Sequence, residues 1–178
     1  MVRGADIAAL ILIACFSLNL AFRSETLVIE ISLLIFSAML LIGAYLDWVL
    51  RRAPHWLSLS VLGAGFVFAL LNGPEALGAA AAGALLMGGL LFAAQRRFFR
   101  SRGIHGLGTG DVVYLSAVSA WLGPFGALLM LGGGSALALA LGPVLKEKRL
   151  PLVSTAALVA LALANIEPAV LWSWGAGG

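Results

Sequence analysis

Two aspartates, Asp47 and Asp111, are the residues of this chain whose type and placement indicate chemistry. Asp111 opens a long apolar run, and Asp47 closes the apolar run of residues 27–46. A carboxylate that enters a membrane segment is costly unless it is paired or neutralised, so it marks a functional site by default. If the two side chains meet, they can share one proton and hydrolyse a peptide bond. We therefore predict an aspartyl protease pair that needs no metal and no other cofactor.

Two glycines, Gly108 and Gly110, precede Asp111 at positions where the backbone must bend or pack closely. They would let a substrate backbone or a partner helix approach the acid. The alternative interpretation is that both acids only end helices. Asp111 would then be an N-terminal acid favoured by the helix dipole, and Asp47 would pair with Arg51 one turn later. Spacing alone does not separate the two interpretations.

The composition places the chain in a membrane. It has 178 residues, of which 62% are hydrophobic and 11% are charged, and a water-soluble domain of this size cannot bury so much apolar surface. The net charge of +3 is too small to indicate a nucleic-acid partner. The single cysteine, Cys15, allows no disulfide within the chain, and two histidines, His55 and His105, are too few for a metal site.

Apolar runs and their punctuation predict an all-α, polytopic membrane helix bundle of about seven transmembrane helices. The stretch from Asp111 to Leu141 is too long for one span, and Gly123-Pro124 splits it because proline removes a backbone donor. The first segment lacks a cleavage site after it, so we expect a retained helix and not a signal peptide. The predicted segments are about 7–22, 27–47, 56–72, 75–95, 111–122, 124–143 and 152–173.

Basic residues give an independent test of this count. With a cytoplasmic N-terminus and an outer C-terminus, seven spans place ten of the eleven basic residues on the cytoplasmic side, as the positive-inside rule requires. Both aspartates then lie at the cytoplasmic ends of their helices, below a polar loop predicted over residues 96–110. The ten basic residues are Arg3, Arg51, Arg52, Arg96, Arg97, Arg100, Arg102, Lys146, Lys148 and Arg149.

Two stretches together resemble the type IV prepilin peptidases, which are GxGD membrane aspartyl proteases. The stretch from Asp47 to His55 resembles the first motif of that family, in which proline follows an aspartate by seven residues with basic residues between them; here the proline is Pro54. Gly108-Thr109-Gly110-Asp111 resembles the second motif, glycine-any-glycine-aspartate. The spacing of the two motifs and the apolar segments between them also match.

The resemblance implies an intramembrane aspartyl endopeptidase in the cytoplasmic (inner) membrane, with Asp47 and Asp111 as the catalytic pair. Its partners would be the lipid bilayer and a prepilin-like substrate with an N-terminal apolar helix, whose basic leader is removed at the cytoplasmic face. Residues 27–178 would form the six-helix peptidase core, and residues 1–26 an additional helix. The chain is similar to the short form of tight-adherence (Flp) or archaeal preflagellin peptidases, so we expect no methyltransferase activity.

The chain departs from the family pattern at two places. The usual Ile-Pro-Asn is Ala53-Pro54-His55, which places His55 near the predicted site, and the lysine common two residues after the second aspartate is Val113. The change at Val113 bears on substrate placement. Two other functions stay open: a small ion or proton transporter or pilus-assembly factor that binds a cation with the paired aspartates, and a catalytically silent relative.

Overall fold

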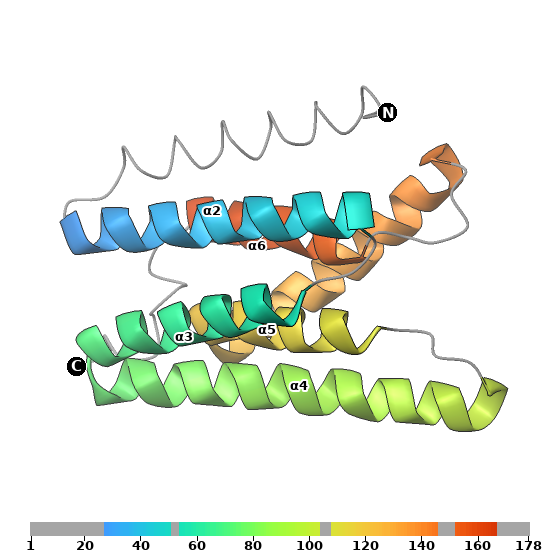
Figure 1. The fold of residues 1–178 in the computed structure, drawn as a ribbon, viewed down its shortest axis with the longest axis horizontal. Coiled ribbons are helices and arrows are strands. Elements are labelled where there is room, and N and C mark those ends of the chain that lie inside the picture. Colours follow the sequence, from blue (N-terminus) through green and yellow to red (C-terminus); the bar gives the residue numbers. More distant parts are fainter. Residues whose placement is uncertain (1–26, 51–53, 104–107, 146–151, 167–178) are drawn as a thin grey trace.

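The computed structural model describes residues 27–50, 54–103, 108–145 and 152–166, and these residues form five helices (Figure 1). The prediction of an all-α fold is confirmed for them. The predicted helix at 7–22 lies outside the described residues, so the count of seven stays a prediction. The helices are α2 (Leu27–Leu50), α3 (His55–Leu71), α4 (Pro74–Arg102), α5 (Thr109–Leu145) and α6 (Leu152–Ile166).

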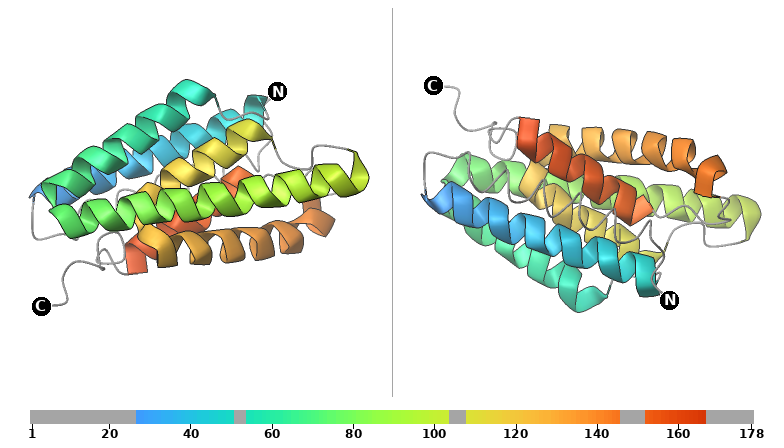
Figure 2. Two further views of the ribbon diagram at one scale, coloured as in Figure 1. Left: turned by 90° about the horizontal axis from the view of Figure 1, so that it is seen from below. Right: turned by 90° about the horizontal axis from the view of Figure 1, so that it is seen from above.

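The helices lie side by side and share two common ends (Figures 1 and 2). At one end α2 and α4 finish while α3, α5 and α6 begin, and we call this the basic end because exposed Arg96, Arg97 and Arg100 of α4 lie there. At the opposite end α3 turns into α4 through Asn72 and Gly73. The chain therefore gathers the helix ends that carry the predicted site at one end of the bundle.

Helix α5 is broken at Gly123, as the sequence predicts. The backbone there has φ 66° and ψ −179°, in a region that glycine enters without steric cost. Pro124 follows at the start of the second arm, where its missing N–H is tolerated. The second arm then returns toward the basic end (Figures 1 and 2). The described residues thus supply six helical segments, two of them from α5.

Helix α4 is longer than predicted. The sequence predicts a helix at about 75–95 followed by a polar loop from residue 96, but α4 continues to Arg102. Arginine is a good helix former, and the helix stops only at Gly103, which is left-handed (φ 68°, ψ 7°) and donates its N–H to the carbonyl of Phe99 at 2.8 Å. With 29 residues, α4 is about 44 Å long, so its last turns project beyond α5 (Figure 1).

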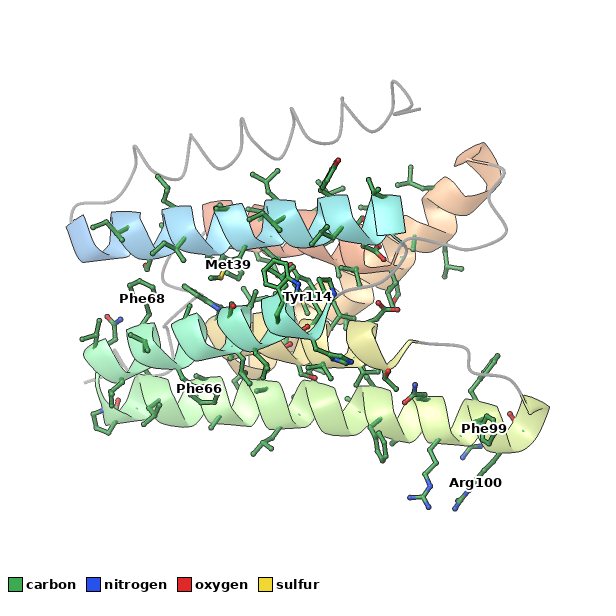
Figure 3. The ribbon with its side chains drawn as sticks, viewed as in Figure 1. Met39, Phe66, Phe68, Phe99, Arg100 and Tyr114 are labelled. Atoms are coloured by element: carbon green, nitrogen blue, oxygen red, sulfur yellow. The ribbon has the colours of Figure 1, made fainter. Side chains whose placement is uncertain are left out.

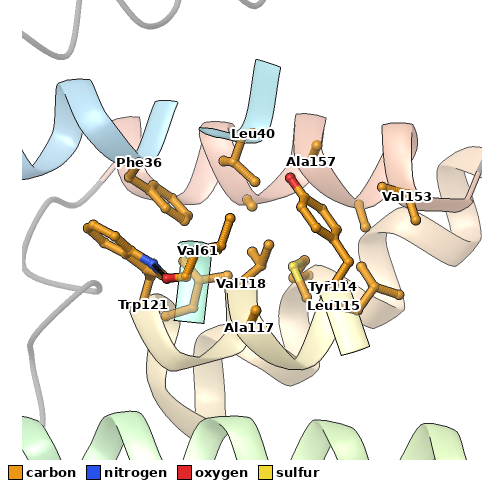
Figure 4. Packing of buried hydrophobic residues seen from close by; sticks show 14 of the residues in the cluster. Phe36, Leu40, Val61, Tyr114, Leu115, Ala117, Val118, Trp121, Val153 and Ala157 are labelled. Atoms are coloured by element: carbon orange, nitrogen blue, oxygen red, sulfur yellow. Dashed lines mark hydrogen bonds between the residues drawn. The ribbon is translucent and has the colours of Figure 1, made fainter. Parts of the chain in front are cut away.

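The core is centred on Trp121 in the first arm of α5, which is fully buried. Its ring stacks on Phe36 of α2, with centroids 4.9 Å apart, and lies 5.4 Å from the ring of Phe68 in α3. Its indole N–H donates to the carbonyl of Val61 at 2.8 Å (Figure 4). A methyl group at Gly65 would come within 2.8 Å of the same nitrogen. One side chain thus joins three helices.

The outer surface of the bundle is apolar. Large side chains such as Leu59, Leu71, Leu85 and Leu139 are more than 60% exposed, which suits contact with lipid and not with water. Pro74–Ser101 is long and apolar enough to cross a membrane, by length and composition, and Thr109–Leu141 passes the same test although the break at Gly123 divides it into two arms. Ile31–Asp47, His55–Leu71 and Leu152–Ala164 are shorter apolar helices. These features indicate a membrane protein.

We predict that Gly83→Ala weakens the packing of α4 on α5, whereas Gly89→Ala does not. A methyl group at Gly83 would overlap the carbonyl oxygen of Ser119 and lie 2.9 Å from the carbonyl carbon of Gly123, and both are backbone atoms. Overpacking of this kind costs about 1–3 kcal/mol of unfolding free energy. Gly89 has open space around it. Thermal unfolding of both variants in detergent measures the difference, and equal melting temperatures would contradict this packing.

Candidate functional site

Asp47 lies in the last turn of α2 and is half-buried. Its Oδ2 accepts a hydrogen bond from the Ser154 hydroxyl at 3.2 Å. Ser154 lies in the first turn of α6, and its oxygen is also 3.4 Å from the carbonyl oxygen of Ala44. The start of α6 therefore faces the carboxylate of Asp47, and the positive end of a helix dipole favours a negative group there.

Asp111 lies in the first turn of α5 and is also half-buried. Its carboxylate accepts a hydrogen bond from the backbone N–H of Gly108, while the N–H of Val112 donates to the Gly108 carbonyl at 3.2 Å. The acid at the third helical position thus makes one half of a capping box, because Gly108 has no side chain to make the other half, and the bond from Val112 is the first bond of the helix. The interpretation of Asp111 as an N-terminal acid therefore describes its local geometry correctly, and that geometry is compatible with catalysis. The predicted partner of Asp47, Arg51, lies outside the described residues.

The glycines before Asp111 differ in their surroundings. A methyl group at Gly108 would lie 3.0 Å from Oδ2 of Asp111, so the missing side chain lets the carboxylate fold back over the backbone. Gly110 is half-buried within the first turn of α5. Of the two, Gly108 has a specific contact with the acid.

Tyr114 joins α5 to α2 next to both acids. It is fully buried, and its hydroxyl donates to the carbonyl oxygen of Met39 at 3.1 Å (Figure 3). A methyl group at Gly43 would overlap the Tyr114 hydroxyl, so glycine at this position leaves space for the Tyr114 side chain. The ring itself packs among the buried side chains shown in Figure 4.

The contact between Gly43 and Tyr114 relates the positions of the two acids along their helices. Asp47 comes four residues after Gly43 on α2, and Asp111 comes three residues before Tyr114 on α5. Because the two helices run in opposite directions (Figure 1), both steps lead toward the basic end, by about 6 Å and about 4.5 Å. Both acids thus lie on the basic-end side of the same contact, each about one turn from it along its own helix. Their action as a pair stays a prediction.

The other predicted site residues also lie at the basic end. Pro54 is extended (φ −70°, ψ 139°) and precedes α3, and its carbonyl accepts the N–H groups of Leu57 and Ser58 at 3.1 and 3.3 Å. His55 begins α3 and is exposed. Val113 is 37% exposed. Among the described residues, no three His, Cys, Asp or Glu side chains are grouped as a metal site requires.

An open hollow of about 660 Å³ runs along the projecting end of α4. It is lined by Ala93, Arg96, Arg97, Arg100 and Ser101, and Arg100 extends from the far turns of the helix in Figure 3. Guanidinium groups at the end of a membrane helix can bind anionic lipid headgroups. We do not assign them to the site, because all of them belong to the projecting end of α4 and not to the helix ends that carry the acids.

Sequence reasoning missed three residues around the acids: Ser154, Tyr114 and Gly43. Gly43 and Tyr114 could have been found by helical spacing, since each is one turn from an acid within its own helix. Ser154 could not, because it is 107 residues from Asp47 along the chain and only the packing of α6 against α2 brings it there.

Comparison with protein families gives one finding. Residues 34–166, well over half of the chain, match the type IV leader peptidase family, and the match includes both aspartates. The chain therefore belongs to this family. Searches against curated proteins and against solved structures gave no match. Family membership makes the chain a leader peptidase with a peptide substrate.

We predict that Gly43→Ala lowers both stability and peptidase activity, whereas Gly63→Ala changes neither. The added methyl group at Gly43 pushes the Tyr114 ring away from α2, which displaces the turn that carries Asp111. The cost is on the order of 1–3 kcal/mol. Gly63 in α3 has nothing within 4 Å of an added methyl group. Melting temperature and leader cleavage are measured together.

The double variant Gly43→Ala/Tyr114→Leu tests the cause. If the methyl group and the ring compete for one space, the double variant loses less stability than the sum of the two single variants. Strict additivity would show that Gly43 and Tyr114 do not share this contact.

Proposed function

We propose that the chain is an intramembrane aspartyl endopeptidase in which Asp47 and Asp111 act as a pair. Its reaction is the removal of the basic leader peptide from prepilin-like proteins at the cytoplasmic face of the inner membrane. Membership of the type IV leader peptidase family supports the leader-peptidase part of this proposal. The catalytic residues, the substrate and the membrane face rest on the arguments that follow.

The proposal rests on the position of each acid about one helical turn beyond the contact between Gly43 and Tyr114. The Gly43–Tyr114 contact joins α2 to α5, and one acid follows it on each helix toward the basic end. Both acids are half-buried, so part of each side chain stays accessible at the helix ends. A pair of carboxylates in that position suits hydrolysis just inside one face of the membrane.

Two carboxylates at close range cannot both remain ionised, so they hold one proton between them. The ionised member takes a proton from a water molecule as its oxygen attacks the peptide carbonyl carbon. The protonated member donates its proton to the carbonyl oxygen. As the tetrahedral intermediate collapses, the newly ionised carboxylate takes a proton from one of its hydroxyl groups, the newly protonated carboxyl gives its proton to the leaving amine as the C–N bond breaks, and the pair regains its starting state. The reaction consumes one water and requires no metal.

The charges of the basic end support the cytoplasmic face as the site of cleavage. Arg96, Arg97 and Arg100 lie at this end, and the positive-inside rule places such residues in the cytoplasm. A substrate with an N-terminal apolar helix would lie in lipid against the bundle and keep its basic leader in the cytoplasm. The bond between leader and helix would then lie at the depth of Asp47 and Asp111.

A transporter that binds a cation between the aspartates is favoured less. Such a protein needs polar groups that continue from the acids across the membrane. Within the described residues, the interior beyond the acids holds apolar side chains such as Phe36, Trp121 and Leu122, and none of the buried polar residues is charged. The buried polar residues of the whole described part of the chain are Ser32, Ser37, Ser58, Gln95, Ser119, Ser154 and Thr155, and Ser58, Gln95, Ser154 and Thr155 lie toward the basic end and not beyond the acids.

We predict that Asp47→Asn and Asp111→Asn each abolish leader cleavage. Either change removes one proton-transfer group while it keeps the size of the side chain, and losses of a positioned acid or base are on the order of 10²–10⁴ in rate. Glu75→Gln is the matched control, because this exposed acid lies in the first turn of α4 at the opposite end of the bundle. Co-expression with a prepilin and an immunoblot for the shortened product measure cleavage.

Three outcomes decide the proposal. Loss of cleavage in both aspartate variants, with full cleavage in wild type and Glu75→Gln at equal protein levels, supports it. Cleavage that survives either aspartate substitution would show that the aspartates are not the catalytic pair. Failure of the wild type to cleave prepilins that a related peptidase processes would indicate a catalytically silent relative.

A further inference from the structure

Ser154, on α6, places a hydroxyl group at the basic end, on a different helix from either acid. Ser154 donates to Oδ2 of Asp47 at 3.2 Å and is only 8% exposed. The bond joins the last turn of α2 to the first turn of α6. A buried donor aimed at a candidate catalytic carboxylate is a means of fixing its direction.

The packing of α6 explains why the hydroxyl is held there. A methyl group at Gly134, in the second arm of α5, would lie 2.9 Å from the Cα of Ala156, so these two helices are in close backbone contact. On the side of α2, Ala44 is 5% exposed, and its carbonyl oxygen is a second acceptor for the Ser154 hydroxyl at 3.4 Å, which is longer than the 3.2 Å bond to Asp47. Small residues on both sides leave Ser154 little freedom to move away from Asp47.

From this geometry we infer that Ser154 is a positioning residue for Asp47 in the hydrolysis reaction. The inference rests on the proposed function, since it requires that Asp47 act on the water. A carboxylate at the end of a helix turns about two side-chain bonds, and each orientation presents its oxygens differently. The hydrogen bond from Ser154 selects one orientation before substrate arrives, which avoids the loss of rate that misplacement causes.

The test compares Ser154→Thr with Ser154→Val in the full-length protein. These side chains have the same shape, and only threonine keeps the hydroxyl, so any strain from the added methyl group is common to both. Thr155→Val is the control, because the Thr155 hydroxyl is buried in the same turn but donates to the carbonyl of Leu152 in its own helix at 3.1 Å. Cleavage of a purified prepilin in detergent gives kcat and KM, and thermal unfolding gives stability.

We expect kcat of Ser154→Val to fall about tenfold or more below that of Ser154→Thr, with similar KM and similar melting temperatures. Thr155→Val retains the kcat of wild type. A purely structural serine would lower the melting temperature and leave kcat of the folded fraction unchanged. Equal kcat for the threonine and valine variants would overturn the inference.

Asp47→Asn is measured in the same assay, so that the positioning role of Ser154 and the catalytic role of Asp47 are tested separately. If Asp47→Asn is inactive and Ser154→Val is as active as Ser154→Thr, the positioning role is wrong and the proposed function stands. If Asp47→Asn is active, the proposed function fails and the inference fails with it. If neither bulkier variant folds, Ser154→Ala decides, because it only removes the oxygen: an unchanged kcat contradicts the positioning role.

Discussion

A carboxylate at the edge of an apolar bundle loses hydration free energy, and the arrangement of the helices offsets this loss with hydrogen-bond donors. Neither acid is left to apolar side chains alone. Asp111 accepts the N–H of Gly108 at the start of its own helix, and Asp47 accepts the hydroxyl of Ser154 at the start of α6. In both cases the acid faces a helix N-terminus, where the dipole favours negative charge. The site is therefore built from helix ends, and the bundle must bring those ends together.

To bring these helix ends together, the chain must reverse its direction inside the bundle, where the backbone finds few polar groups to bond with. The break at Gly123 sends the second arm of α5 back toward the basic end, so that α6 begins beside Asp47. Trp121 fixes the first arm just before this break by contacts with α2 and α3. Glycine at 83 lets α4 approach the same turn. The packing around the break in α5, which is distant from the acids, thus determines that α6 begins beside Asp47.

The sequence predicts much of this arrangement because its signals are local. Gly123-Pro124 gives the break, the charges of α4 indicate the basic end, and the two motifs indicate the acids. The end of α4 was predicted too early, because a polar run of arginines resembles a loop in hydropathy although arginine favours helix, and only Gly103 ends it. Ser154 and the contact between Gly43 and Tyr114 depend on helix packing over long chain separations. Helical spacing places Gly43 and Tyr114 one turn from the acids, but no local pattern predicts that these two residues touch or that Ser154 bonds to Asp47.

The central claim is that the two carboxylates can share a water molecule, which places their oxygens roughly 6 Å apart, or two hydrogen-bond lengths. The most direct measurement is crosslinking of Asp47→Cys with Asp111→Cys in a Cys15→Ser background, using a thiol crosslinker of that span and mass spectrometry of the joined peptides. The account predicts efficient crosslinking of this pair and none between Asp111→Cys and Asn72→Cys, which lies at the opposite end. Absence of the 47–111 product in folded protein, with both thiols reactive, would contradict it.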